Sequence, residues 1–282
     1  MTRLDLCSES TARAVARRFQ VRPRRELGQN FLVDPAVREL IVAEVGEGSE
    51  VLEVGAGLGG LTQGLLDHGL PVLAVELDPS CVRALGLLRR AHPALRVVQG
   101  DILRLDPQTL DLGPEAVVVG NVPYGITGAL LPWLLGWRPP PPDLWLLVQR
   151  EVARRLAAPP GDWSLATLGL RALAQVDTVF DVVPESFWPP PEVHSTLVHI
   201  RSRPDADPDW ARALADLARP VFQARRKQLH HGLARSLAVD PEDASALLRQ
   251  VGIDPSRRPG SLDLEEWRRL LASTSSGVPR KR

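Results

Sequence analysis

The sequence predicts an α/β protein, in which an open, mostly parallel β-sheet with crossover helices is followed by a small α-helical domain. From Val51 onward, short apolar segments bounded by Gly, Asp or Pro alternate with amphipathic segments. This alternation is typical of parallel strands joined by helices. Beyond residues 203–208, which have the composition of a linker, only helical patterns follow. We therefore expect a basic N-terminal arm over residues 1–32, an α/β domain over 33–203 and a helical domain over 208–275.

The same patterns predict the individual elements. Strands are expected at Val51–Val54, Val72–Val75, Leu95–Val98, Ala116–Val119 and Leu144–Val148, with two edge strands at Val176–Val182 and Ser195–Ile200. Helices of the α/β domain are expected at about 61–68, 79–91, 126–136 and 149–157. Helices of the C-terminal domain are expected at about 209–222, 226–238, 241–251 and 263–271. The arm is expected to form a basic helix followed by a loop.

Length, composition and charge limit the possible classes of protein. The chain has 282 residues, 44% of them hydrophobic, which suffices for one large domain and a smaller second one. No apolar segment reaches the roughly 18 residues of a membrane helix, and no apolar signal core follows the Arg-rich N-terminus. The two cysteines, Cys7 and Cys81, have no neighbours at metal-ligand spacing, so we expect free thiols and no metal site. These features predict a cytoplasmic protein without membrane contact, with a monomer as the default state.

A glycine-rich loop follows the first predicted strand. Gly55, Gly57 and Gly60 match the pattern G-x-G-x-x-G, in which glycine lets the backbone approach a ligand at the start of a helix. This loop fits NAD, S-adenosylmethionine or a tight turn without a ligand. Glu76 ends the second strand, where a carboxylate can accept hydrogen bonds from ribose hydroxyls. Asp101 follows the third strand, where it can meet an adenine amine or cap the next turn.

The fourth predicted strand ends in the most informative motif of the chain, Asn121-Val122-Pro123-Tyr124. The exocyclic amine of adenine is a weak nucleophile because its lone pair is delocalised into the ring. The Asn121 side-chain oxygen and the Pro123 carbonyl can accept its two hydrogens, and Tyr124 can stack on the base. Phe187, in an aromatic, proline-rich segment, can cover an extruded base or simply cover the core. The motif therefore predicts methyl transfer to adenine, catalysed by positioning and dipoles.

In their order and spacing, these motifs resemble the rRNA adenine-N6,N6 dimethyltransferases, from about Arg24 to about Leu271. The resemblance implies a Rossmann-like class I methyltransferase fold. It implies that S-adenosylmethionine contacts Asn30, Leu32, Gly55, Glu76, Asp101 and Asn121, with Gly57 in the glycine loop. It also implies that the target adenine is held by Asn121, Pro123, Tyr124 and Phe187.

The resemblance further implies an RNA substrate. The small-subunit branch of the family is nearest, because residues 252–255 and 262–270 resemble its C-terminal domain. The implied substrate is a pair of adjacent adenines near the 3′ end of 16S rRNA, dimethylated in a precursor of the 30S subunit. The implied contacts with RNA phosphates are Arg24, Arg25, Arg225, Arg226 and Lys227.

Three alternatives stay open. The 23S rRNA methyltransferases that confer macrolide resistance share almost all of these motifs. A non-enzymatic RNA-binding or assembly factor could keep the fold, although the intact Asn121 motif argues against it. An NAD-dependent dehydrogenase would need a hydride-handling histidine near the glycine loop, and the sequence offers no evident candidate. The chain also departs from the family's usual pattern at Glu26, Gly125, Trp163-Ser164 and His231.

Overall fold

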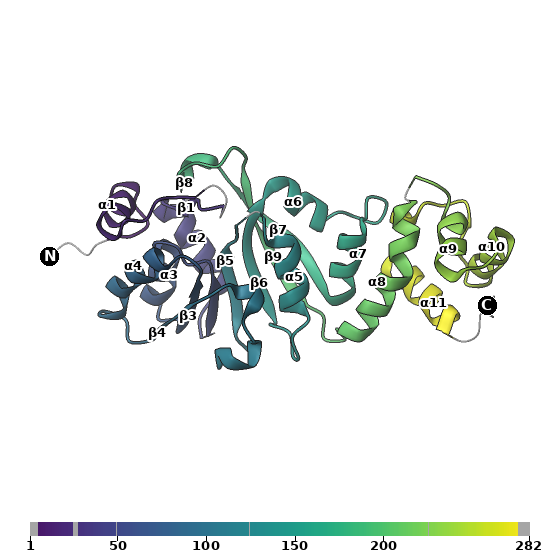
Figure 1. Cartoon of the computed structure of the whole chain (residues 1–282), viewed down its shortest axis with the longest axis horizontal. Helices are drawn as coiled ribbons and strands as arrows, with labels where there is room; N and C mark the ends of the chain where they lie inside the picture. Colours follow the sequence, from purple (N-terminus) through teal and green to yellow (C-terminus); the bar gives the residue numbers. More distant parts are fainter. Residues whose placement is uncertain (1–4, 25–27, 49, 124, 225, 276–282) are drawn as a thin grey trace. The chain divides into compact units, whose positions relative to one another are not determined.

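The computed structural model describes residues 5–24, 28–48, 50–123, 125–224 and 226–275. The chain divides into two compact units (Figure 1). The first unit consists of residues 1–153 and 176–202, and the second of residues 154–175 and 203–282. Across the described ranges, no helix combines the length and the apolar character needed to cross a membrane.

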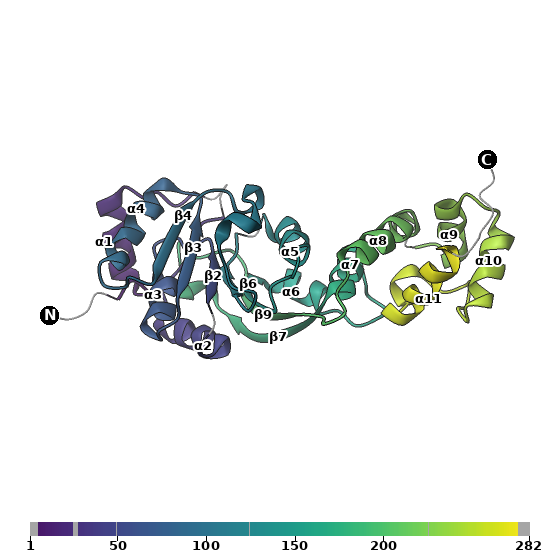
Figure 2. The ribbon, with the colours of Figure 1, turned by 90° about the horizontal axis from the view of Figure 1, so that it is seen from below.

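A seven-stranded sheet forms the centre of the first unit, in the order β4-β3-β2-β5-β6-β9-β7. The five neighbouring strands from β4 to β6 run parallel, and β9 pairs antiparallel with β6. Figure 2 shows β4, β3 and β2 side by side. The strands are β2 (Val51–Val54), β3 (Val72–Glu76), β4 (Leu95–Gln99), β5 (Val117–Asn121), β6 (Asp143–Gln149), β7 (Ala174–Val182) and β9 (Ser195–Ser202). The strands predicted from the sequence are thus confirmed, as is the place of the last two at one edge.

A separate two-stranded sheet lies beside the central one in the first unit. It pairs β1 (Phe31–Leu32) antiparallel with β8 (Phe187–Trp188). The sequence patterns predict neither strand, because two residues are too few to show the alternation of a half-buried strand.

Helices cover both faces of the central sheet. Side chains of α1 to α4 share one hydrophobic cluster with Val51, Val72 and Val119. Leu52 and Val118 point to the opposite face, where they share a cavity with Trp133 of α5. The helices are α1 (Glu9–Phe19), α2 (Pro35–Val45), α3 (Gly60–Asp67), α4 (Pro79–Arg89), α5 (Thr127–Leu135) and α6 (Arg150–Leu156).

The basic N-terminal segment packs against the first unit. In α1, Ala12, Val15 and Ala16 are buried in the hydrophobic cluster, whereas Arg17 and Arg18 are exposed. The predicted basic helix is therefore present, with an apolar face that joins the core and a charged face that meets solvent.

Two helices are absent from the sequence prediction, although local signals mark both. Asp34 caps α2 by accepting from the backbone N–H groups of the second and third residues after it, and Pro35 occupies the first turn. Ser164 caps α7 (Leu165–Leu173) by accepting from Thr167 N at 3.1 Å. Both helices begin with an ordinary N-terminal cap. The capping residues therefore indicate these two helices better than the spacing of their apolar residues does.

The second unit is helical. Its helices are α7, α8 (Pro208–Gln223), α9 (Leu229–Leu237), α10 (Pro241–Gln250) and α11 (Leu264–Ser275). The rings of Phe222 and the fully buried Trp267 stack with centroids 5.9 Å apart. Helices α8 and α9 cross closely at Gly232, where an added Cβ would lie 2.9 Å from Val221 Cα. The predicted C-terminal helices are confirmed, with α9 beginning at Leu229 rather than at 226.

We expect Gly232→Ala to destabilise the helical unit, because Val221 Cα belongs to the backbone and cannot swing aside. Overpacking of this kind costs about 1–3 kcal/mol, and the midpoint of urea unfolding at constant m-value measures it. Gly169→Ala is the matched control, since Gly169 lies inside α7 with nothing within 4 Å of an added Cβ. There alanine should stabilise the helix by roughly 0.5–1 kcal/mol. Equal unfolding free energies of the two variants would contradict the close crossing.

Candidate active site

A pocket of about 410 Å³ opens at the carboxyl ends of β2, β3 and β5. Open parallel sheets bind their ligands at this edge, and pockets of about 300–1,000 Å³ suit small molecules. The pocket is lined by the glycine loop after β2 and by residues 28–32, here called the pocket wall. The predicted cofactor residues all line it, namely Asn30, Leu32, Gly55, Gly57, Glu76, Asp101 and Asn121.

The glycine loop lets the backbone form one side of the pocket. Gly55, Gly57 and Gly59 have φ angles of +75°, +56° and +86°, which glycine adopts without strain. At Gly57 an added Cβ would lie only 2.8 Å from the ring of Phe31. The Gly57 N–H donates to Glu76 Oε2 at 2.7 Å. This hydrogen bond joins the loop to the end of β3.

Acidic side chains give the pocket its charge. Its described lining residues include Glu53, Glu76 and Asp101, and they include no Lys or Arg. Glu53 is 1% exposed, and its Oε2 atom has no hydrogen-bond partner among the described residues. Burial raises the pKa of Glu53 to about 7, and the nearby Glu76 carboxylate acts in the same direction. Charge complementarity therefore favours a cationic ligand over an anionic one.

The other two acids are held by the backbone. Glu76 Oε1 accepts from Asp78 N at 2.7 Å, so both oxygens of Glu76 are fixed, and each keeps a lone pair for a ligand hydroxyl. Burial raises the pKa of Glu76. Asp101 Oδ1 accepts from Leu103 N at 3.1 Å and caps the turn that follows β4. Asp101 therefore has the capping role that the sequence offered as one alternative. It also lines the pocket, as the other alternative requires.

A long-range hydrogen bond sets the orientation of Asn121 at the end of β5. Its Nδ2 atom donates to Asn30 O at 2.6 Å, which leaves the amide oxygen available as an acceptor. Pro123 O accepts from Ile126 N at 3.1 Å, and its second lone pair can take another donor. Asn121 and Pro123 both line the pocket. Tyr124, the predicted stacking residue, lies outside the described residues.

Phe187 lies away from the pocket that it was expected to cover. Phe187 is 3% exposed, belongs to the hydrophobic core and is not among the lining residues. In β8 it pairs with Leu32, and Trp188 pairs with Phe31. Because Leu32 and Phe31 line the pocket, β8 supports the pocket wall. A direct role of Phe187 in holding a base stays a prediction.

The predicted phosphate contacts are distributed over both units. Arg226 and Lys227 are exposed in the turn between α8 and α9. The Arg24 side chain is 54% exposed, and its Nη2 atom lies 3.0 Å from a carboxylate oxygen of the buried Asp78. Arg25 and Arg225 lie outside the described residues.

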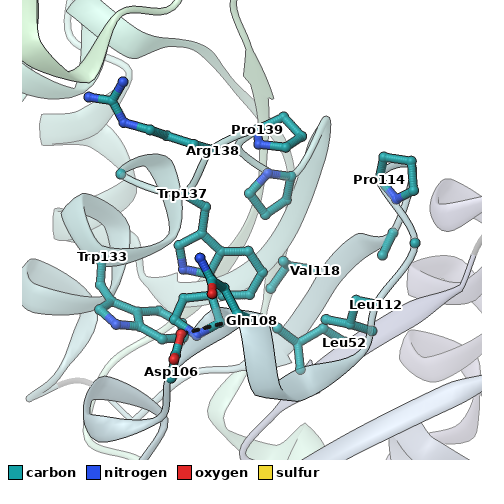
Figure 3. A pocket seen from close by; sticks show the side chains of 15 residues that line it. Leu52, Asp106, Gln108, Leu112, Pro114, Val118, Trp133, Trp137, Arg138 and Pro139 are labelled. Atoms are coloured by element: carbon teal, nitrogen blue, oxygen red, sulfur yellow. Dashed lines mark hydrogen bonds between the residues drawn. The ribbon is translucent and has the colours of Figure 1, made fainter.

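A second cavity, of about 490 Å³, lies on the face of the sheet that α5 covers (Figure 3). None of the predicted site residues lines this cavity. Leu52 and Val118 line it from the sheet, and Trp133 and Trp137 from the end of α5 and the loop after it. The two indole rings meet edge to face with centroids 5.0 Å apart. Among the residues that the structure covers, no group of three or more His, Cys, Asp or Glu side chains could hold a metal ion. The pocket at the glycine loop is therefore the candidate active site.

Two solved structures share this fold. The 23S rRNA methyltransferase ErmE has a TM-score of 0.69 and 27% identity, with 88% of this chain and 100% of that chain covered. A dimethyladenosine transferase from Plasmodium falciparum has a TM-score of 0.74 and 24% identity, with 87% and 97% covered. With its mostly parallel sheet and the pocket at the strand ends, the chain has a Rossmann-like methyltransferase fold.

The chain belongs to the ribosomal RNA adenine dimethylase family, whose profile matches residues 20–273. Similar proteins named ribosomal RNA small subunit methyltransferase A occur in Brucella abortus biovar 1 and Dehalococcoides mccartyi. The Brucella protein is 39% identical over 264 residues, which cover 90% of this chain and 94% of that protein. The Dehalococcoides protein is 38% identical over 258 residues, which cover 89% and 88%. The resemblance inferred from the motifs is confirmed, and the protein is an rRNA adenine dimethyltransferase.

Glu53 predicts a pH-dependent stability of the ligand-free protein. Its pKa rises from 4.5 to about 7 on folding, so the folded state binds the extra proton between these values. Stability therefore falls as the pH rises through this range. Relative to Glu53→Gln, which cannot ionise, the wild-type free energy of unfolding should fall by roughly 3 kcal/mol between about pH 4.5 and 8.

Urea unfolding at several pH values measures this difference. Glu44→Gln is the control, because Glu44 is exposed on α2, and its curve should run parallel to that of the wild type. A parallel curve for Glu53→Gln would show that folding does not raise the pKa of the Glu53 carboxyl.

Proposed function

We propose that this enzyme uses S-adenosylmethionine to dimethylate the N6 amines of two adjacent adenines near the 3′ end of 16S rRNA. The observation that carries the cofactor assignment is the charge of the pocket. Three acids line it, and no Lys or Arg is found among the described lining residues. S-adenosylmethionine presents a sulfonium and an ammonium group, whereas NAD presents a pyrophosphate. Opposite charge therefore favours S-adenosylmethionine over NAD.

The residues of the pocket fit this cofactor. Glu53 Oε2, buried without a partner among the described residues, can accept hydrogen bonds from an ammonium group. Glu76 can accept from the ribose hydroxyls and Asp101 from the adenine amine, because each retains unused lone pairs. Because Gly57 has no side chain, the ring of Phe31 can pack against the glycine loop and line the pocket beside it. When bound, S-adenosylmethionine would supply an electrophilic methyl group.

Asn121 and Pro123 would act on the target amine. The Asn121 oxygen and the Pro123 carbonyl can accept the two N6 hydrogens, which favours a pyramidal nitrogen with a free lone pair. Both acceptors are neutral and fixed by the fold, so they need no reorganisation as the reaction proceeds. No strong base is required, because the amine proton becomes acidic only as the nitrogen attacks.

The small-subunit target is supported by the relatives named ribosomal RNA small subunit methyltransferase A, which match 90% and 89% of this chain. We propose that the enzyme acts as a monomer in the cytoplasm on a precursor of the 30S subunit. A second candidate target is 23S rRNA, favoured by the 27% identity to ErmE over 88% of the chain. Both targets use the same chemistry.

Transfer of labelled methyl groups from S-adenosylmethionine tests the proposal. The substrates are undermethylated 30S subunits, 50S precursors and naked 23S rRNA, followed by nucleoside analysis. We expect N6,N6-dimethyladenosine on 30S subunits alone. The same product on 23S rRNA would move the enzyme to the second target, and no product on any substrate would leave a binding protein with a methyltransferase fold.

Asn121→Ala should lower turnover by about 100-fold, the effect of removing one preorganised polar partner of a reacting group. The Kd of S-adenosylmethionine should change far less, since Asn121 is assigned chiefly to the amine. Single-turnover kinetics and calorimetric titration measure the two quantities separately. An equal loss of turnover and of cofactor affinity would contradict the role assigned to Asn121.

Arg226→Ala should weaken rRNA binding in a salt-dependent manner. Each lost phosphate contact lowers the slope of log K against log salt by roughly 0.7–0.9. Titrations at several salt concentrations measure this slope, with Arg212→Ala as the control on the same unit, since Arg212 is exposed on α8 and pairs with Asp209. An unchanged slope for Arg226→Ala would count against a phosphate contact there.

A further inference from the structure

A buried carboxylate ties the segment before β1 to the end of β3. Asp78 is 3% exposed, and its Oδ2 atom accepts from Arg24 Nη2 at 3.0 Å and from Gln29 Nε2 at 3.3 Å. Gln29 Oε1 in turn accepts from Arg24 N at 2.9 Å. Asp78 Oδ1 accepts from Ser80 N at 2.8 Å and caps α4. We call this group of three residues, Asp78, Arg24 and Gln29, the Asp78 clamp. Through the cap formed by Asp78, the clamp is anchored to the start of α4.

The pocket wall connects the Asp78 clamp to Asn121. Asn30 follows Gln29 directly, and its carbonyl accepts from Asn121 Nδ2 at 2.6 Å. A backbone carbonyl can only accept, so it binds the NH₂ group of the amide and turns the Asn121 oxygen away from itself. Beyond Asn30, Phe31 is held by its pairing with Trp188. The Asn30 carbonyl therefore lies between two fixed points, the Asp78 clamp and β8.

The charge of Asp78 makes the clamp strong. Burial by itself opposes ionisation, but the hydrogen bonds from Ser80, Gln29 and Arg24 outweigh it and hold the pKa of Asp78 below its usual value. Asp78 is therefore ionised at neutral pH. A buried carboxylate that loses one of its partners is strongly destabilised, so the neighbouring groups are kept in place.

We propose that Asp78, acting through Arg24 and Gln29, is a positioning residue for methyl transfer. It holds the Asn30 carbonyl where that carbonyl orients the Asn121 amide oxygen toward the target amine. The proposal rests on the proposed function, in which this oxygen accepts a hydrogen bond from adenine N6. It gives Arg24 a role inside the protein in place of the phosphate contact expected from the sequence.

Kinetics of Arg24→Ala and Asp78→Asn test the proposal, with Arg22→Ala as the matched control. Arg22 is exposed two residues before Arg24. We expect kcat on undermethylated 30S subunits to fall about 10- to 100-fold in the first two variants, because misplacement of a reacting group acts on kcat. The salt slope of rRNA binding should stay at its wild-type value, and the Kd of S-adenosylmethionine should change far less than kcat. Arg24→Lys, which keeps the ion pair, should recover most of kcat.

A second readout does not depend on activity. The side-chain ¹⁵N–H₂ resonances of Asn121, assigned by their loss in Asn121→Ala, should shift in Arg24→Ala and Asp78→Asn but not in Arg22→Ala. This readout still reports on the clamp if the wild-type protein transfers no methyl group, so failure of the proposed function is separable from failure of the clamp. Asp78→Asn preserves the helix cap, since Asn caps helices about as well as Asp.

Two results would overturn the proposal. The first is a set of Asn121 resonances that stays unchanged in both clamp variants. The second is a lower salt slope of rRNA binding in Arg24→Ala with an unchanged kcat, which would identify Arg24 as a phosphate contact.

Discussion

The hydrogen bond from the Gly57 N–H to the Glu76 carboxylate joins the two strand ends on which the site is built. A buried carboxylate needs donors, and a loop without side chains offers its backbone N–H groups at close range. Because Gly57 has no Cβ, the ring of Phe31 can pack against it. This hydrogen bond thus fixes both the glycine loop and Glu76. The missing side chain of Gly57 also lets Phe31 of the pocket wall lie against the loop.

In the proposed mechanism, different groups of the site recognise the cofactor and activate the acceptor. Acids line the part of the pocket assigned to the cofactor, and the buried Glu53 has an oxygen without a partner among the described residues. A cation compensates such a group, whereas a pyrophosphate would add repulsion. The groups assigned to the target amine are instead neutral acceptors, Asn121 and Pro123. Because these acceptors carry no net charge, their effect on the amine depends on the direction in which their oxygens point.

Orientation in this site depends on segments that lie far apart in the sequence. The pocket wall is held by Asp78 on one side and by β8 on the other, and through Asn30 it contacts Asn121. Phe187 illustrates the consequence, since its aromatic, proline-rich segment supports the wall while its ring is buried in the core. Under the proposed mechanism, Asp78 and β8 would influence methyl transfer by fixing the backbone of the pocket wall, which contacts Asn121.

The sequence by itself determined where the strands lie along the chain, and it determined the glycine loop and the polar motif at the end of β5. These features follow from apolar periodicity and glycine placement, which are local properties of the sequence. It also placed the glycine loop, Glu76, Asp101 and Asn121 around one pocket, since the carboxyl ends of parallel strands meet at one edge. Only the tertiary structure decided that Asn121 donates to Asn30, 91 residues away, that Arg24 binds Asp78, and that Phe187 is buried behind the wall. These pairings are contacts between distant segments, and a side chain's local sequence does not specify the partner that the fold brings to it.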